Sequence, residues 1–77
     1  MTATHVVLNV PSVSCDHCKA AIEGAVGALD GVDQVLVDVA EKTVAVDFEP
    51  ASVGLASIEA AVAAEGYEVA GRHVFDV

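Results

Sequence analysis

The chain has 77 residues, 55% of them hydrophobic, so it can form one small domain with a core and is too apolar to be disordered. Three Lys and Arg against twelve Asp and Glu give a net charge of -9, which argues against nucleic acid and anionic membranes as partners. No run of about 18 apolar residues is present, and no basic residue precedes the short apolar N-terminal stretch. We therefore expect a single domain over residues 1–77, no membrane insertion, no signal peptide and a cytoplasmic location.

The first half of the chain predicts a strand, a helix and a hairpin. Residues 4–10 are rich in β-branched side chains and end at a proline, which is typical of a strand. Residues 16–29 carry apolar side chains at helical spacing, and Gly31 is a C-terminal stop signal. Residues 32–50 alternate with period two on both sides of "AEK", which predicts a hairpin with one core-facing side. Leu36 falls on the opposite side.

The second half predicts a helix and a last strand. Residues 54–66 have helical spacing between two glycines, and residues 67–75 read as a strand that is interrupted at Gly71. The order β-α-β-β-α-β is that of the α+β, ferredoxin-like sandwich. Right-handed crossovers would place both helices on one face of a four-stranded antiparallel sheet.

The only two cysteines, Cys15 and Cys18, stand three positions apart at the junction of a loop and the first predicted helix. Unpaired N–H groups at a helix N-terminus favour negative charge, so they lower a nearby thiol pKa and promote the thiolate. Two thiolates suit Cu(I) and also Zn(II). Structural zinc needs four ligands, and the chain offers two sulfurs and His17 at most, so the ligand count favours Cu(I) or another transiently held soft ion.

The C-x-x-C spacing has other uses. It also serves thiol–disulfide exchange, but that function expects a thioredoxin-like arrangement and an aromatic residue near the first cysteine, whereas Val13 and Ser14 precede this pair and the chain has no Trp. Two cysteines without a function are a further alternative. A framework of several disulfides is excluded, because it needs more than two cysteines.

Four stretches together resemble the heavy-metal-associated domain, over about residues 4–70: "VPSVSCDHC", the Gly31 and Val32 pair, the valine-rich hairpin and "EGYEV". Within that family the chain is similar to stand-alone bacterial copper chaperones. The usual family motif is Gly-Met-x-Cys-x-x-Cys, and Ser12 and Val13 replace its Gly and Met here. The resemblance implies that Val13 is a hydrophobic plug under the loop, with less volume than the usual methionine.

The resemblance also implies roles for individual residues. Cys15 and Cys18 match the two metal-binding cysteines, and Tyr67 matches an aromatic residue that lies beside the metal loop in bacterial chaperones. His17 matches a "Cys-x-His-Cys" variant common in those chaperones. Zinc-exporting relatives carry an acid where this chain has Ser14, which favours copper over zinc.

Some of these residues also have ordinary structural explanations. Tyr67 could be an aromatic residue at the edge of the core, and His17 a solvent-facing residue rather than an extra ligand. Lys19, which we expect to be the only base near the loop, could neutralise the two thiolates or simply lie on the helix surface. His5 and His73 would meet on adjacent strands, remote from the cysteines, as a second metal site or as two surface histidines.

The function implied is that of a cytosolic Cu(I)-binding metallochaperone, not an enzyme. It would deliver copper by thiolate exchange to the metal-binding domain of a copper-transporting P-type ATPase or to a copper sensor, and two copies could share one copper ion. Zn, Hg and Cd remain candidate ions. The alternatives are an excised domain of a metal ATPase or mercuric reductase, against which Met1 and the compact ending argue, and a thiol oxidoreductase.

Overall fold

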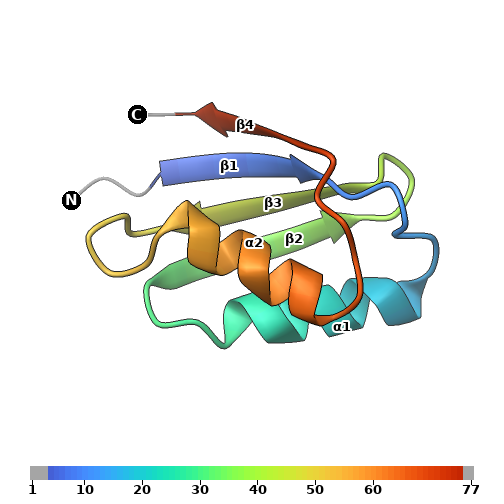
Figure 1. The fold of residues 1–77 in the computed structure, drawn as a ribbon, viewed down its shortest axis with the longest axis horizontal. Helices are drawn as coiled ribbons and strands as arrows, with labels where there is room; N and C mark the ends of the chain where they lie inside the picture. The colour runs from blue at the N-terminus through green and yellow to red at the C-terminus, as the bar shows by residue number, and fades with distance from the viewer. Residues whose placement is uncertain (1–3, 76–77) are drawn as a thin grey trace.

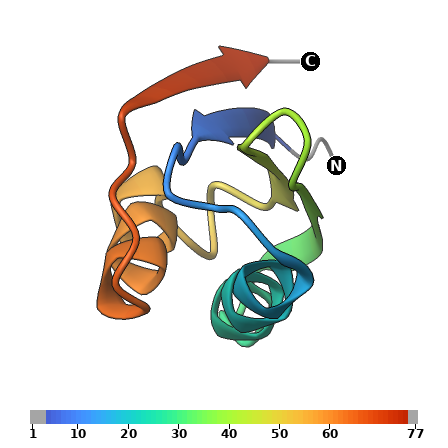
Figure 2. The same ribbon diagram turned by 90° about the vertical axis from the view of Figure 1, so that its right-hand side faces the viewer.

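The computed structural model of the protein describes residues 4–75, so Met1 lies outside the described part. Its elements follow the predicted order and are β1 (Thr4–Asn9), α1 (Asp16–Gly27), β2 (Val32–Asp38), β3 (Thr43–Phe48), α2 (Leu55–Ala64) and β4 (Gly71–Phe75). The strands form one antiparallel sheet in the order β2-β3-β1-β4. Both helices cover the same face of this sheet (Figures 1 and 2). The ferredoxin-like α+β fold is confirmed.

The core lies between the sheet and the two helices. Alternate residues of β1 and β3 point into it, as period-two patterning predicts, and each helix contributes a stripe at helical spacing. Its fully buried members include Val6, Leu8, Val44 and Val46 from the strands and Ile22, Val26, Ile58 and Val62 from the helices. Leu36 lies on the open face of the sheet and is 55% exposed, as the alternation predicts.

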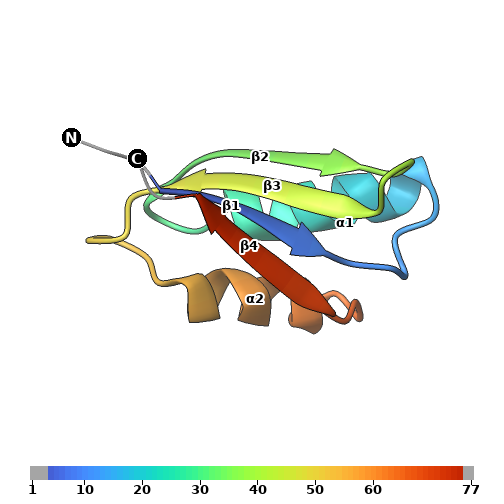
Figure 3. The same ribbon diagram turned by 90° about the horizontal axis from the view of Figure 1, so that it is seen from above.

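The register brings three connecting segments to one end of the sandwich. Asn9, the last residue of β1, is opposite Thr43 at the start of β3 and opposite Gly71 at the start of β4. The β1–α1 loop, the β2–β3 turn and the α2–β4 connection therefore meet at this end, which Figure 3 shows from above. This end of the fold carries the two cysteines.

The last predicted strand is too long. Residues 67–70 form no regular element, and β4 begins only at Gly71. In this connection Tyr67 and Val69 pack against the core, and the Ala70 N–H donates a hydrogen bond of 2.8 Å to the Asn9 carbonyl. The chain has to return from α2 to the sheet before it can pair, so the apolar side chains here serve packing rather than a ladder.

The two predicted histidines lie on neighbouring strands, His5 near the start of the inner strand β1 and His73 in the middle of the edge strand β4. Nδ1 of His5 is 2.5 Å from Oδ1 of Asp47, and the ring of His73 packs on Phe75 with 4.3 Å between centroids. The Phe75 ring also contacts His5, at 5.6 Å. His5 is half-buried and His73 is exposed. Among residues 4–75 no group of three or more His, Cys, Asp and Glu side chains could hold a metal ion.

No helix within the described residues is long and apolar enough to cross a membrane.

Candidate metal site

The loop before the cysteines is folded back on itself and anchored in the core. The Val13 N–H donates a hydrogen bond of 3.1 Å to the Val10 carbonyl, and both side chains are fully buried. Pro11, Ser12 and Ser14 are exposed between and after them. Val13 thus occupies the position of a plug beneath the loop, and the chain emerges at the surface where Cys15 begins the helix.

The two cysteines lie at the junction of this loop and α1. Cys15 is the N-cap residue, with extended backbone angles (φ -156°, ψ 169°), and Cys18 lies in the first turn. Their sulfurs are 3.4 Å apart, far longer than a disulfide bond of about 2.05 Å. Both thiols are free, Cys15 exposed and Cys18 half-buried. Two metal–sulfur bonds of about 2.3 Å, the length known for zinc, span at most about 4.6 Å, so one ion can bridge this pair.

Hydrogen bonds favour the thiolate form of Cys18. They lower its pKa to about 6, and the side-chain hydrogen bond from Tyr67 is the largest cause, followed by the Ser14 backbone and the Cys15 side chain. The same hydrogen bond raises the pKa of Tyr67 to about 12, because it is lost with the phenolic proton; burial and the negative charge of Cys18 add to this effect. Near neutral pH the pair therefore presents a thiolate at Cys18.

Three other residues predicted for the site lie at or near the surface of the protein. Ser14 and His17 are exposed, and Lys19 is half-buried on α1. In the described part of the chain no third His, Cys, Asp or Glu completes a metal cluster with Cys15 and Cys18. The candidate site offers two sulfurs, a donor set that suits Cu(I) and is smaller than the four ligands of a structural zinc site.

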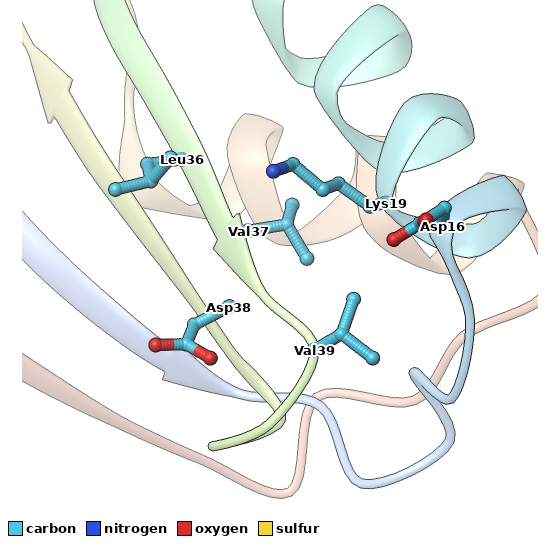
Figure 4. A pocket seen from close by; sticks show the side chains of 6 residues that line it. All are labelled: Asp16, Lys19, Leu36, Val37, Asp38 and Val39. Carbon is cyan, nitrogen blue, oxygen red and sulfur yellow. The ribbon is translucent and has the colours of Figure 1, made fainter.

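A shallow groove borders the site between α1 and the edge strand β2. It is lined by Asp16, Lys19, Leu36, Val37, Asp38 and Val39. Figure 4 shows Asp16 and Lys19 on the helix side, with Val37 of β2 and Val39, just after the end of β2, directed toward them. Asp16 and Lys19 directly follow the two cysteines in sequence, so the groove begins next to the cysteine-bearing turn of α1.

The sequence led us to expect that Lys19 is the only base near the loop, and this prediction was wrong. Nζ of Lys42, in the β2–β3 turn, donates a hydrogen bond of 3.0 Å to the Val13 carbonyl. The predicted topology could have indicated that the two segments are neighbours, since the turn before β3 and the loop after β1 must lie at the same end of an antiparallel pair. Sequence proximity to the cysteines had pointed to Lys19 instead.

This fold and this exposed dithiol define a small metal-binding domain. The sequence pattern of the heavy-metal-associated domain matches residues 7–68, and the chain belongs to that family. It is similar to the copper chaperone CopZ of Staphylococcus haemolyticus, with 38% identity over 63 residues, 82% of this chain and 93% of the relative.

Solved structures show the same likeness. A CopZ metallochaperone superimposes with a TM-score of 0.82 at 34% identity, over 84% of this chain and 97% of that one. The water-soluble region of the P-type ATPase CopA from Bacillus subtilis superimposes with a TM-score of 0.82 at 30% identity, over 90% of this chain and 46% of that one.

Proposed function

We propose that this protein is a cytoplasmic copper chaperone that binds Cu(I) through Cys15 and Cys18 and hands it to another protein. The observation that carries the proposal is the exposed pair of free thiols, 3.4 Å apart. The names of the relatives support copper as the ion, as does a donor set of two soft sulfurs. Zn, Hg and Cd are rival ions that the same thiolates could hold.

Transfer proceeds by ligand exchange at the exposed edge. A cysteine thiolate of the partner forms a new sulfur–copper bond, which makes the ion three-coordinate, and one bond to Cys15 or Cys18 then breaks. A second partner thiolate repeats the exchange, so that the remaining bond to this chain breaks and the ion leaves with two partner sulfurs. Copper keeps its oxidation state throughout, so no electron acceptor is needed. The hydrogen bond from Tyr67 stabilises the Cys18 thiolate once its bond to copper is released. The exposure of Cys15 gives the partner sulfur access.

The proposed partner is a metal-binding domain of a copper-transporting P-type ATPase. The structural likeness to the soluble region of CopA supports this pairing, because two related domains can offer matching cysteine loops to one ion. A copper sensor is a second candidate recipient, and two copies of the chain could share one ion in the same way. The whole chain would act as a single domain without catalytic turnover.

Competition between Cu(I) and Zn(II) for the reduced protein, followed by native mass spectrometry, tests the proposal. We expect one Cu(I) per chain to displace zinc and then to move to an added ATPase metal-binding domain. Exclusive zinc binding, or copper that stays bound in the presence of the recipient, would contradict it.

A thiol oxidoreductase is the enzymatic alternative. The lowered pKa of Cys18 is compatible with thiol exchange, whereas the family and the two-sulfur site favour metal transfer. Catalysed reduction of insulin at a rate above that of free dithiol would favour the enzyme.

A further inference from the structure

Two hydrogen bonds join the β2–β3 turn to the metal loop, and both involve Lys42. The Val10 N–H donates to the Lys42 carbonyl over 2.9 Å, and the Lys42 ammonium donates to the Val13 carbonyl over 3.0 Å. The lysine therefore contacts the loop at both of the residues whose side chains anchor it in the core. The Val13 carbonyl is two residues before Cys15.

The backbone conformation of Lys42 does not explain why a lysine stands at this position of the turn. Its φ is 57°, and in the described part of the chain it is the one residue other than glycine with positive φ. Glycine or asparagine adopts this left-handed conformation at lower cost. What lysine adds at this position is the side-chain contact with Val13.

The two cysteines differ in how they are held. Cys18 lies within α1 and receives the hydrogen bond from Tyr67. Cys15 has no side-chain capping bond at the start of the helix, so its position depends on the loop that precedes it. A contact that fixes Val13 therefore acts on the sulfur that is otherwise less constrained.

We propose that Lys42 is a positioning residue that clamps the metal loop and thereby sets how long Cu(I) is retained before transfer. The inference rests on the proposed function. Without the clamp the loop samples more conformations, so Cys15 spends less time where it can hold the ion together with Cys18. Preorganisation of this kind favours the bound state and slows dissociation.

Three variants of Lys42 separate the clamp from the turn. Lys42→Met keeps the backbone cost of positive φ and loses the donor, whereas Lys42→Arg keeps both the cost and a donor. Lys42→Gly loses the donor but relieves the backbone. The matched control is Arg72→Met, which also removes one positive charge but breaks an ion pair with Glu59 (Nη1 to Oε2, 2.8 Å) that lies between β4 and α2.

The first measurement is amide hydrogen exchange of the metal-free, reduced protein. We expect the Val13 amide to exchange roughly threefold to tenfold faster in Lys42→Met and Lys42→Gly, the range that loss of one hydrogen bond gives. Lys42→Arg and Arg72→Met should exchange as the wild type does. A melting temperature of Lys42→Gly at or above that of the wild type would show that this change is not a loss of global stability.

The second measurement is the rate at which loaded protein releases Cu(I) to a bathocuproine disulfonate chelator. We expect the same order of variants, with release about threefold to tenfold faster in Lys42→Met and Lys42→Gly.

Unchanged Val13 exchange in both variants, or equal acceleration in Arg72→Met, would overturn the clamp. Faster exchange with unchanged release would overturn the role in retention. A wild type that binds no Cu(I) would instead overturn the proposed function and the retention role with it, while the exchange data would still decide whether Lys42 holds the loop.

Discussion

The side chains of Tyr67 and Cys18, 49 positions apart in sequence, shift each other's pKa, that of Cys18 down to about 6 and that of Tyr67 up to about 12. The contact joins the connection after α2 to the first turn of α1, and it is the largest cause of the lowered Cys18 pKa. The ring of Tyr67 also packs against the core. Tyr67 therefore packs at the edge of the core and also acts on the Cys18 thiol, while its role beside a bound metal ion stays a prediction.

Tyr67→Phe should raise the pKa of Cys18 from about 6, because it removes the largest stabilising contact of the thiolate and keeps the ring. We expect little change in melting temperature and a different rate of Cu(I) release to a chelator. The pH dependence of Cys18 alkylation, followed by mass spectrometry, measures the pKa. The metal-free Cys15→Ser background isolates the single thiol. If the alkylation profile is the same with Phe as with Tyr at this position, Tyr67 has a packing role only.

The stability of the metal-free protein should depend on pH through Cys18. Its folded pKa of about 6 is below the ordinary value of 9.0, so between these values the unfolded chain binds more protons. The thiolate thus contributes stability that is fully present above pH 9.0 and is lost as the pH falls through about 6. Denaturant unfolding of wild type and Cys18→Ser from about pH 5 to about pH 10 measures the difference, which should grow with pH. A constant difference would contradict a depressed pKa.

Cys15→Ser and Cys18→Ser should each abolish tight Cu(I) binding and leave the fold intact. A hydroxyl is a poor ligand for a soft ion, and neither thiol is fully buried. Titration with Cu(I) against a chelator gives the affinity, and circular dichroism checks the fold. His17→Ala is the control variant and should keep tight Cu(I) binding, because the His17 side chain is exposed and forms no metal cluster with the two cysteines. Wild-type affinity in either cysteine variant would eliminate the two-thiolate site.

Periodicity was sufficient to predict the elements, because each strand of the hairpin and each helix shows one buried face that alternation or helical spacing reveals. It failed at residues 67–70, where Tyr67 and Val69 pack against the core without belonging to a strand. An alternating pattern records burial, not backbone pairing. Hydrophobic patterning likewise gave no indication that Lys42 lies beside the metal loop, so Lys19 was predicted to be the only base there.

The cysteine pair could be proposed as a metal site from the sequence because its ligand chemistry is local, within four residues of chain. The Lys42 contact is not local: it joins a turn to a carbonyl 29 positions away. Topology predicts that these segments are neighbours, but a contact between a flexible side chain and a backbone carbonyl depends on loop geometry that hydrophobic patterning does not encode. The tyrosine contact was reached through family resemblance for the same reason.

Gly31→Ala should destabilise the fold by about 2 to 4 kcal/mol, since its φ is 96° and an added Cβ would lie 2.7 Å from Cβ of Ser52. Gly24→Ala, within α1 where nothing lies within 4 Å of the new Cβ, should instead stabilise by about 0.5 to 1 kcal/mol. Chemical denaturation of both variants gives the two free energies of unfolding. Equal effects of the two substitutions would show that the turn before β2 does not require glycine.

Copper transfer to an ATPase domain should slow as salt is added. At a net charge of -9 the protein repels acidic surfaces, so a productive partner should carry Lys or Arg around its own cysteine loop. Asp16 and Asp38 line the groove beside the metal site, and they offer such bases a place to pair, with Lys19 as the local exception. Steering of this kind weakens as the Debye length falls from about 10 Å at 0.1 M salt to about 3 Å at 1 M. Stopped-flow transfer rates across that range, with Asp16→Asn and Asp38→Asn as variants, measure the effect, and each variant should lower the rate at low salt more than at high salt. A rate that is indifferent to salt, or rises with it, would mean that docking is mainly apolar and that the acidic surface serves solubility.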